Sequence, residues 1–276
     1  MNGVVYKSTG SWYTVKATDG VFYECKIKGK FRIEGIKSTN PVAAGDHVVF
    51  EVETKGDETI GIINKIAPRE NYIIRKSVNL SKQTHIIAAN VNVAFLLVTL
   101  NNPPTFAPFI DRFLVTAEAY HIKAVLLFNK IDTYNEEQTL EIKYLAALYR
   151  SIGYECVGIS AKTGKNIDKV KQMMQGKVSM FSGHSGVGKS TLVNTLEPTL
   201  ELKTKQISTQ HMQGQHTTTF AEMYDLSFGA QIIDTPGIKG FGVVEVEKQE
   251  LGNYFPEFFE LKDQCKFNNC LHKQEP

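Results

Sequence analysis

Eight consecutive residues have the types and the spacing of a phosphate-binding loop. Positions 183–190 read G-H-S-G-V-G-K-S, after an apolar run and before a stretch of helical character. Glycines allow successive backbone N–H groups to point into one concavity, and the N-terminus of the following helix adds partial positive charge. Lys189 can then reach the β- and γ-phosphates of a nucleotide, and Ser190 can ligate Mg²⁺. The predicted nucleotide contacts of this loop are Gly183, His184, Ser185, Gly186, Val187, Gly188, Lys189, Ser190 and Thr191.

A second pattern, N-K-x-D, follows the apolar run 124–128 and resembles the guanine-reading motif of GTPases. The Asp132 carboxylate can accept two hydrogen bonds from guanine, from N1–H and from the 2-amino group. Adenine offers neither donor and would leave the carboxylate unpaired, so the site would reject it. The Lys130 stem can pack on the base, and the Asn129 amide can brace the loop. These residues predict a site for guanine rather than adenine.

Two shorter patterns extend the predicted site. The S-A-K motif, in which a backbone N–H meets the guanine oxygen, is matched by Ser160, Ala161 and Lys162. It follows the predicted strand 154–159. The D-x-x-G motif follows the predicted strand 230–233, with Asp234 near Mg²⁺ through water and the Gly237 N–H free for the γ-phosphate. Since all four patterns directly follow predicted strands, they indicate one ligand site at the carboxyl ends of a sheet.

The polar stretch 203–220 lacks periodicity, and we interpret it as the first switch loop. One of its threonines should ligate Mg²⁺ when GTP is bound, and we favour Thr217 or Thr218. Many GTPases place a water-orienting Gln directly after D-x-x-G, but here that position is Ile238. Intrinsic hydrolysis should therefore be slow, or another residue must serve. His216 could orient or deprotonate the attacking water, and the alternative is a solvated loop histidine.

A third group of candidate ligands lies near the C-terminus. Cys265, Cys270 and His272 offer two thiolates and an imidazole within eight residues, which suits tetrahedral Zn²⁺. A structural zinc site needs a fourth ligand. Cys25 and Cys156 lie in predicted strands and are poor substitutes. The alternative is that the three residues hold no metal.

The elements that must position the nucleotide motifs alternate regularly. Apolar runs predict strands at 93–98, 124–128, 154–159 and 178–181, and helical spacing predicts helices at 109–120, 136–151 and 167–174. Strands that alternate with helices indicate an α/β fold, with a parallel sheet covered by helices on both faces. Before them, the stretch 75–82 is basic and polar, and it is either an RNA contact or a solvated connector.

Residues 1–68 differ, because short β-branched and aromatic runs alternate with turn signals there. This pattern predicts a small all-β barrel, and the OB-fold is the commonest such module that binds oligonucleotides. A run of alternating cations would occupy one side of a strand: Lys26, Lys28, Lys30 and Arg32. That side is either an RNA-binding face or a solvated outer face, since Glu24 and Glu34 bracket it.

The composition sets wider limits. The chain has 276 residues, 42% of them hydrophobic, and a formal net charge of +2, which is too small to indicate nucleic-acid binding by itself. No apolar run approaches the length of a membrane span, and the N-terminus lacks the features of a signal peptide. We therefore expect a cytoplasmic protein without a membrane partner. Four cysteines in such a chain argue against a disulfide framework.

The order of the motifs is unusual, since N-K-x-D and S-A-K precede the phosphate loop. This order resembles that of a circularly permuted GTPase. With the barrel before it and the Cys/His segment after it, the whole chain closely resembles the ribosome small-subunit-dependent GTPase A family. The resemblance implies an OB-fold barrel at 1–68, a circularly permuted P-loop GTPase domain at 69–245 and a zinc segment at 246–276. The family pattern supplies a further cysteine shortly after Pro276, so we interpret the sequence as truncated or as lacking a tail.

The resemblance also implies the function. We expect a GTPase that uses GTP and GDP with Mg²⁺ and a structural Zn²⁺, binds the 30S subunit and its 16S rRNA, and assists late maturation of that subunit. We expect it to be monomeric. Three alternatives remain open: a constitutive RNA-binding scaffold with a structural nucleotide site, an ATP-using P-loop enzyme, and a GTPase that acts on the large subunit.

Overall fold

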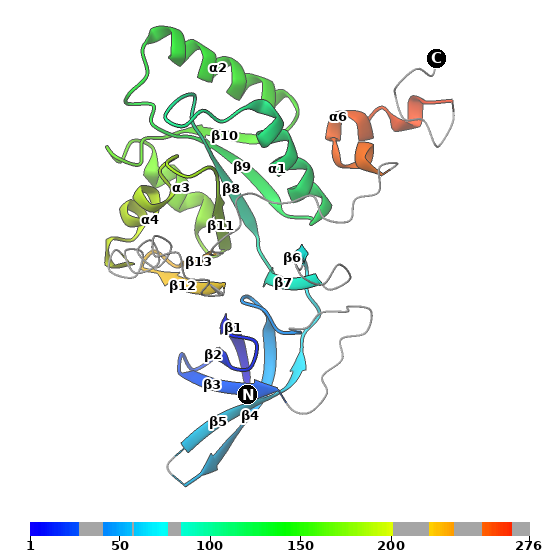
Figure 1. Cartoon of the computed structure of the whole chain (residues 1–276), viewed down its shortest axis with the longest axis vertical. Coiled ribbons are helices and arrows are strands. Elements are labelled where there is room, and N and C mark those ends of the chain that lie inside the picture. The colour runs from blue at the N-terminus through cyan, green and yellow to red at the C-terminus, as the bar shows by residue number, and fades with distance from the viewer. Residues whose placement is uncertain (28–40, 57, 77–83, 201–220, 235–249, 267–276) are drawn as a thin grey trace. The chain divides into compact units, whose positions relative to one another are not determined.

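The computed structural model describes the chain except residues 28–40, 57, 77–83, 201–220, 235–249 and 267–276 (Figure 1). Contacts divide it into two compact units. The first contains residues 1–93, 171–180 and 199–238, and the second contains 94–170, 181–198 and 239–276. Each unit is thus assembled from three separate stretches of the chain. The domain boundaries expected from the sequence group residues by chain order instead, and they stay a prediction.

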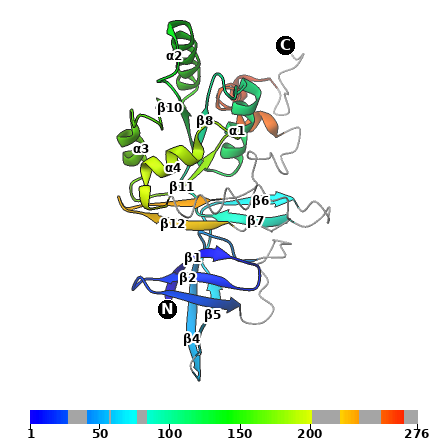
Figure 2. The ribbon, with the colours of Figure 1, turned by 60° about the vertical axis from the view of Figure 1, so that its left-hand side comes forward.

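The first unit begins with a closed barrel of five strands (Figure 2). These are β1 (Asn2–Ser8), β2 (Tyr13–Ala17), β3 (Phe22–Ile27), β4 (His47–Lys55) and β5 (Glu58–Ile66). β1 pairs antiparallel with both β2 and β4, and β3 pairs in parallel with β5, which closes the ring. Alternate side chains point inward and form a core that includes Val15, Phe50 and Ile63. The predicted OB-like barrel is therefore confirmed.

Close approaches require glycine at Gly45 and Gly61, among other positions in this unit. A Cβ on Gly61 would lie 2.3 Å from the Cys25 sulfur, so β3 and β5 could not pair as they do. Gly45 has a φ of +91°, and a Cβ there would lie 2.0 Å from the Ala89 carbonyl oxygen. Only glycine fits both the backbone conformation and the space at Gly45.

Further strands complete the first unit. β6 (Tyr72–Lys76) and β7 (Thr84–Ala89) form a two-stranded sheet, so the first residues of the expected basic linker lie in a strand. The rest of that stretch, 77–82 with its Lys82, lies outside the described residues. β12 (Glu222–Leu226) and β13 (Ala230–Asp234) form an antiparallel hairpin. One strand of this hairpin pairs with β1, and the other pairs in parallel with β11 (Val178–Ser182).

The second unit is a parallel α/β arrangement, as predicted. Its strands follow the order β10-β9-β8-β11. The elements new to this unit are β8 (Val93–Val98), α1 (Ala107–Ala119), β9 (Lys123–Phe128), α2 (Glu136–Ser151), β10 (Glu155–Gly158), α3 (Ile167–Met174) and α4 (Lys189–Leu196). All six residues of β8 are buried, as expected for a parallel strand covered on both faces. α1 and α4 lie on opposite sides of these strands (Figure 1).

The remaining described elements are short helical turns. They are η1 (Pro198–Leu200) and, later, η2 (Leu251–Tyr254), α6 (Pro256–Phe259) and η3 (Lys262–Gln264). Among the residues that the structure describes, no helix is both long enough and apolar enough to span a bilayer.

Candidate nucleotide-binding site

The phosphate loop joins β11 to α4 in the second unit. Gly183, Gly186 and Gly188 have φ angles of +139°, +85° and +102°, which side chains rarely adopt. Space is also limited, because a Cβ on Gly183 would lie 2.8 Å from the Leu97 carbonyl oxygen and one on Gly188 would lie 2.4 Å from Asn129 Nδ2. The strand–loop–helix context that the motif requires is therefore present.

Lys189 is the first residue of α4, and its side chain folds over the loop. Its ammonium nitrogen donates hydrogen bonds to the carbonyl oxygens of Gly183, at 2.6 Å, and His184, at 2.8 Å. A phosphate held by the loop's N–H groups would therefore meet a cation at the same place. Ser190 follows on the first turn of α4 and is exposed to solvent.

Asn129 connects three of the four motifs. Its side-chain Nδ2 donates to the Val187 carbonyl oxygen in the phosphate loop, at 2.8 Å. Its Oδ1 accepts from the backbone N–H of Ala161 in the S-A-K motif, at 3.0 Å. The residue is 2% exposed, so both hydrogen bonds are shielded from water. One buried amide thus ties the base-reading loops to the phosphate loop.

The rest of the N-K-x-D motif forms a turn above the strand ends. Lys130 has a φ of +66°, and its ammonium nitrogen donates to the carbonyl oxygens of Asn102 and Gly186. The Tyr134 hydroxyl donates to the Asn129 carbonyl oxygen at 2.9 Å, which holds the turn against the strand. Asp132 is exposed, so its carboxylate is accessible to a base.

The S-A-K residues form a tight turn after β10. Ser160 and Ala161 are buried and Lys162 is exposed. The Ser160 hydroxyl accepts from the Thr163 N–H at 3.1 Å. The Thr195 hydroxyl of α4 donates to the Ala161 carbonyl oxygen at 2.8 Å, so the helix that follows the phosphate loop also holds this turn.

A ring contact supports the phosphate loop from α1. The rings of His184 and Phe109 have centroids 3.9 Å apart with an interplanar angle of 32°. The motif patterns gave no role to Phe109, Tyr134 or Thr195. Phe109 lies in the first turn of α1, a helix with ordinary apolar spacing, and no local signal in the sequence sets it apart.

Only the first residue of the D-x-x-G motif, Asp234, lies within the described residues. Asp234 ends β13 in the first unit and is the cross-strand partner of Glu222. Gly237 and Ile238 lie outside the described residues. The same holds for the switch residues His216, Thr217 and Thr218, so their predicted roles stay predictions.

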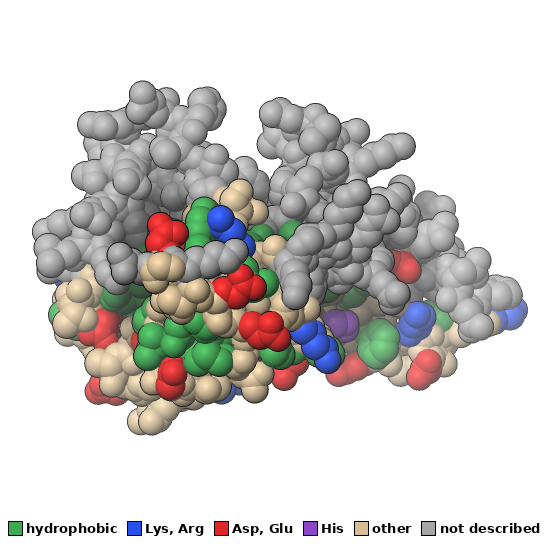
Figure 3. All heavy atoms as spheres, turned by 90° about the horizontal axis from the view of Figure 1, so that it is seen from below, with side chains coloured by type: hydrophobic (Ala, Val, Ile, Leu, Met, Phe, Trp, Pro, Cys, Tyr) green, Lys and Arg blue, Asp and Glu red, His purple; other side chains and the backbone are tan. Residues whose placement is uncertain are grey.

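The predicted RNA and zinc residues are also only partly described. Lys26 lies with its ammonium 4.1 Å from the Trp12 ring centroid, whereas Lys28, Lys30 and Arg32 are outside the described part. The face drawn in Figure 3 carries acidic and basic side chains interspersed, without a large basic patch among the residues described there.

Cys265 is the one predicted zinc ligand in the described ranges, which end at residue 266, and Cys270 and His272 lie beyond them. The described part of the chain brings together no cluster of three or more His, Cys, Asp or Glu side chains able to hold a metal. Burial raises the pKa of Cys25 to about 12, with a further contribution from Glu24, and burial raises that of Cys156 to about 11. Neutral thiols bind metals poorly, so neither substitutes for the missing ligand.

Comparisons with known proteins agree with this geometry. The family model described as RsgA GTPase matches residues 66–244, and that described as RsgA N-terminal domain matches residues 2–63. A relative from Christiangramia forsetii, named "Small ribosomal subunit biogenesis GTPase RsgA", is 72% identical over 276 residues, which cover all of this chain and 88% of the relative. A relative of the same name from Flavobacterium psychrophilum is 66% identical, and the match covers all of this chain and 85% of the relative.

Solved structures show the same likeness. The crystal structure of YjeQ from Thermotoga maritima matches with a TM-score of 0.76 and 32% identity, over 100% of this chain and 87% of that one. The structure of YloQ, described as a circularly permuted GTPase, matches with a TM-score of 0.74 and 28% identity. That match covers 100% of this chain and 84% of the YloQ chain.

Proposed function

The chain belongs to the RsgA GTPase family, and from this premise we propose that it is a GTPase of small-subunit biogenesis whose hydrolysis of GTP is stimulated by the 30S particle. Its relatives are named small ribosomal subunit biogenesis GTPases. The proposal includes late maturation as the stage and 16S rRNA as a contact. It also places the protein in the cytoplasm, as a monomer.

The observation that carries the proposal is the position of Asn129. Its two hydrogen bonds join the guanine-reading turn, the S-A-K turn and the phosphate loop. A base bound at Asp132 and phosphates bound at Lys189 would therefore belong to one nucleotide. Adenine has no N1–H or 2-amino group to donate to the exposed Asp132 carboxylate, which argues against an ATP-using enzyme.

The catalytic roles follow from the chemistry of phosphoryl transfer. Lys189 neutralises charge on the β- and γ-phosphates, and the loop N–H groups hold them in place. The hydroxyl of Ser190 offers an oxygen ligand that fits Mg²⁺, with Thr217 or Thr218 as a further ligand, and the carboxylate of Asp234 would lie near the ion through water. When bound, Mg²⁺ supplies positive charge against the developing phosphate charge.

We propose that His216 orients or deprotonates the attacking water, because the side chain of Ile238 cannot orient it. A His216→Ala variant should lose about 10²-fold or more in turnover while GDP affinity is kept. His47→Ala removes an exposed imidazole in the barrel and is the matched control. Unchanged turnover in His216→Ala would rule out the assignment.

We assign a structural Zn²⁺ to Cys265, Cys270 and His272, on the basis of their ligand chemistry and spacing. The measurement is metal analysis of the purified protein. One equivalent of zinc in the wild type and less than half of that in Cys265→Ser is the expected result.

The decisive experiment combines co-sedimentation and turnover with isolated 30S and 50S particles. We expect the protein to sediment with 30S and its turnover to rise there. Binding without stimulation would favour the RNA-binding scaffold. Sedimentation with 50S alone would favour a GTPase that acts on the large subunit.

A further inference from the structure

The hydroxyl of Tyr6 fastens the hairpin β12–β13 to the barrel. It donates a hydrogen bond to Asp225 Oδ1 on β12, at 2.7 Å, and accepts one from Gln231 Nε2 on β13, at 2.7 Å. Gln231 Nε2 also donates to Asp225 Oδ1, at 3.0 Å. A single barrel side chain therefore contacts both strands of the hairpin.

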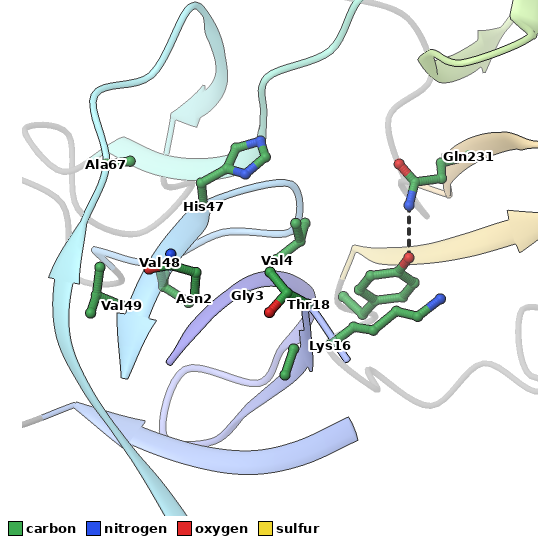
Figure 4. A pocket seen from close by; sticks show the side chains of 12 residues that line it. Asn2, Gly3, Val4, Lys16, Thr18, His47, Val48, Val49, Ala67 and Gln231 are labelled. Carbon is green, nitrogen blue, oxygen red and sulfur yellow. Dashed lines mark hydrogen bonds between the residues drawn. The ribbon is translucent and has the colours of Figure 1, made fainter. Parts of the chain in front are cut away.

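A second barrel strand supports the same contact. The Lys16 ammonium on β2 donates to Asp225 Oδ2 at 2.6 Å and lies 5.5 Å from the Tyr6 ring centroid. Phe22 packs edge-on against that ring, with centroids 5.1 Å apart. A cavity of about 420 Å³ beside the cluster is lined by barrel residues together with Gln231, and Lys16 and Gln231 lie at the same end of it (Figure 4).

The surroundings of this cluster keep Asp225 ionised and shield the Tyr6 hydroxyl from water. Burial raises the pKa of Asp225, but hydrogen bonds from Lys16, Tyr6 and Gln231 and the charge of Lys16 outweigh it, so the net shift is downward. Asp225 is thus a carboxylate at neutral pH. Tyr6 is 5% exposed, so its hydroxyl has little water to replace these partners.

Through β13 the hairpin is linked to two of the nucleotide motifs. Asp225 and Gln231 are direct cross-strand partners, so Tyr6 holds one rung of the ladder. Gln231 is also the register partner of Val178 on β11, the strand that leads into the phosphate loop. Three residues after Gln231, β13 ends at Asp234 of the D-x-x-G motif. Backbone pairing and the Tyr6 hydrogen bonds therefore link the barrel to Asp234, which the proposed function places near Mg²⁺ through water.

We propose that Tyr6 is a positioning residue for GTP hydrolysis, which conveys engagement of the barrel by the small ribosomal subunit to Asp234 through Asp225 and Gln231. This inference rests on the proposed function, since it requires that the subunit stimulates turnover. It assigns to the barrel a part in catalysis in addition to binding.

The test compares Tyr6→Phe with Tyr13→Phe in the full chain. Tyr13 is also buried in the barrel, and its hydroxyl donates to the Gly10 carbonyl oxygen within the barrel, at 3.2 Å. In Tyr6→Phe we expect the ratio of 30S-stimulated to unstimulated kcat to fall roughly fivefold to tenfold. The KM for GTP and the Kd for 30S should change less than twofold. Tyr13→Phe should keep the wild-type ratio.

A second variant guards against a folding defect in the first. Asp225→Asn keeps the size of the side chain but loses the charge that Lys16 pairs with, and it should lower the same ratio. The double variant should be no worse than the more severe single variant, because both changes break one connection.

Each outcome decides a different point. A wild type that 30S does not stimulate overturns the proposed function and this inference with it. A stimulated wild type with an unchanged ratio in both Tyr6→Phe and Asp225→Asn overturns this inference alone. Equal losses in Tyr6→Phe and Tyr13→Phe also overturn it, because they reveal a merely structural role for the barrel.

Discussion

Asn129 joins the base-reading turns to the phosphate loop through its buried side-chain amide. An alanine there would leave the Val187 carbonyl and the Ala161 N–H without their partner in a buried place. The cost of two such unpaired groups is about 1–3 kcal/mol each. We therefore expect Asn129→Ala to lower GDP affinity at least tenfold, measured by isothermal titration calorimetry.

Asn71 is the matched control for that experiment. Its side chain also donates to one backbone carbonyl and accepts from one backbone N–H, both of Val91, at 2.9 Å each. It lies outside all four motifs. Asn71→Ala should reduce stability and keep GDP affinity, and a similar loss of affinity in both variants would contradict the role given to Asn129.

Asp132 should determine which base is bound. Asp132→Asn replaces two acceptor oxygens by one acceptor and one donor, which suits xanthine better than guanine. We expect the preference between GDP and xanthosine diphosphate to invert in competition binding. Asp168→Asn, at an exposed position in the first turn of α3, should keep the preference for GDP. Undiminished guanine selectivity in Asp132→Asn would disprove the assignment.

At the scale of elements, the turn before β4 gives a sharp test of packing. Gly45 and Gly10 have nearly the same φ, +91° and +88°, but only at Gly45 would a Cβ meet backbone, the Ala89 oxygen at 2.0 Å. Alanine at either position lowers the free energy of unfolding by about 1–2 kcal/mol, because the left-handed conformation is unfavourable for a residue with a Cβ. Gly45→Ala should lose at least about 2 kcal/mol more, since backbone must move. Urea unfolding measures both, and equal losses would refute the clash.

Several elements could be predicted from the sequence because local signals specify them. The expected bounds of α2 agree with the structure, since Asn135 and Gln138 form a capping box that starts this helix. α1 begins earlier than expected, at Ala107, because Pro108 is favoured in a first helical turn and was not counted as helical. The strand before each nucleotide motif was also found by its apolar run.

Other features had no local signal. Tyr6 and Asp225 are 219 residues apart, and nothing near either of them in the sequence indicates the partner. The tilted ring contact between His184 and Phe109 likewise depends on how α1 packs. The motifs identified the chemistry of the site, whereas the residues that support it became visible only with tertiary contacts.

At the scale of the whole molecule, stability should fall at alkaline pH. Burial raises the pKa of Cys25 to about 12 and that of Tyr13 to about 12. In the unfolded chain the thiol ionises near pH 8.5 and the phenol near pH 10. A raised folded pKa means that the unfolded state releases protons first, so stability is full below about pH 8.5 and declines toward pH 12.

The measurement is the free energy of unfolding in urea between pH 7.5 and pH 10.5. Cys25→Ala should show a shallower decline than the wild type. Val15→Ala creates a cavity in the same core without removing a thiol, and it should keep the wild-type slope. Parallel curves for all three proteins would disprove the contribution of Cys25.

The pairing of β1 with β12 has a consequence for the synthesis of this chain. Asp225, the partner of Tyr6, is synthesised 219 residues after it. At about 5–20 residues per second, the delay is on the order of ten to forty seconds. During that time the nascent barrel carries lysines where the hairpin will later bind. Lysine at a strand edge discourages pairing with stray strands. Lys16 lies on β2, between β1 and β3, and gains Asp225 as its partner at that stage. Lys7 lies in the part of β1 that pairs with β12, so we expect it to discourage premature association of the emerging polypeptide until Glu222 arrives to pair with it.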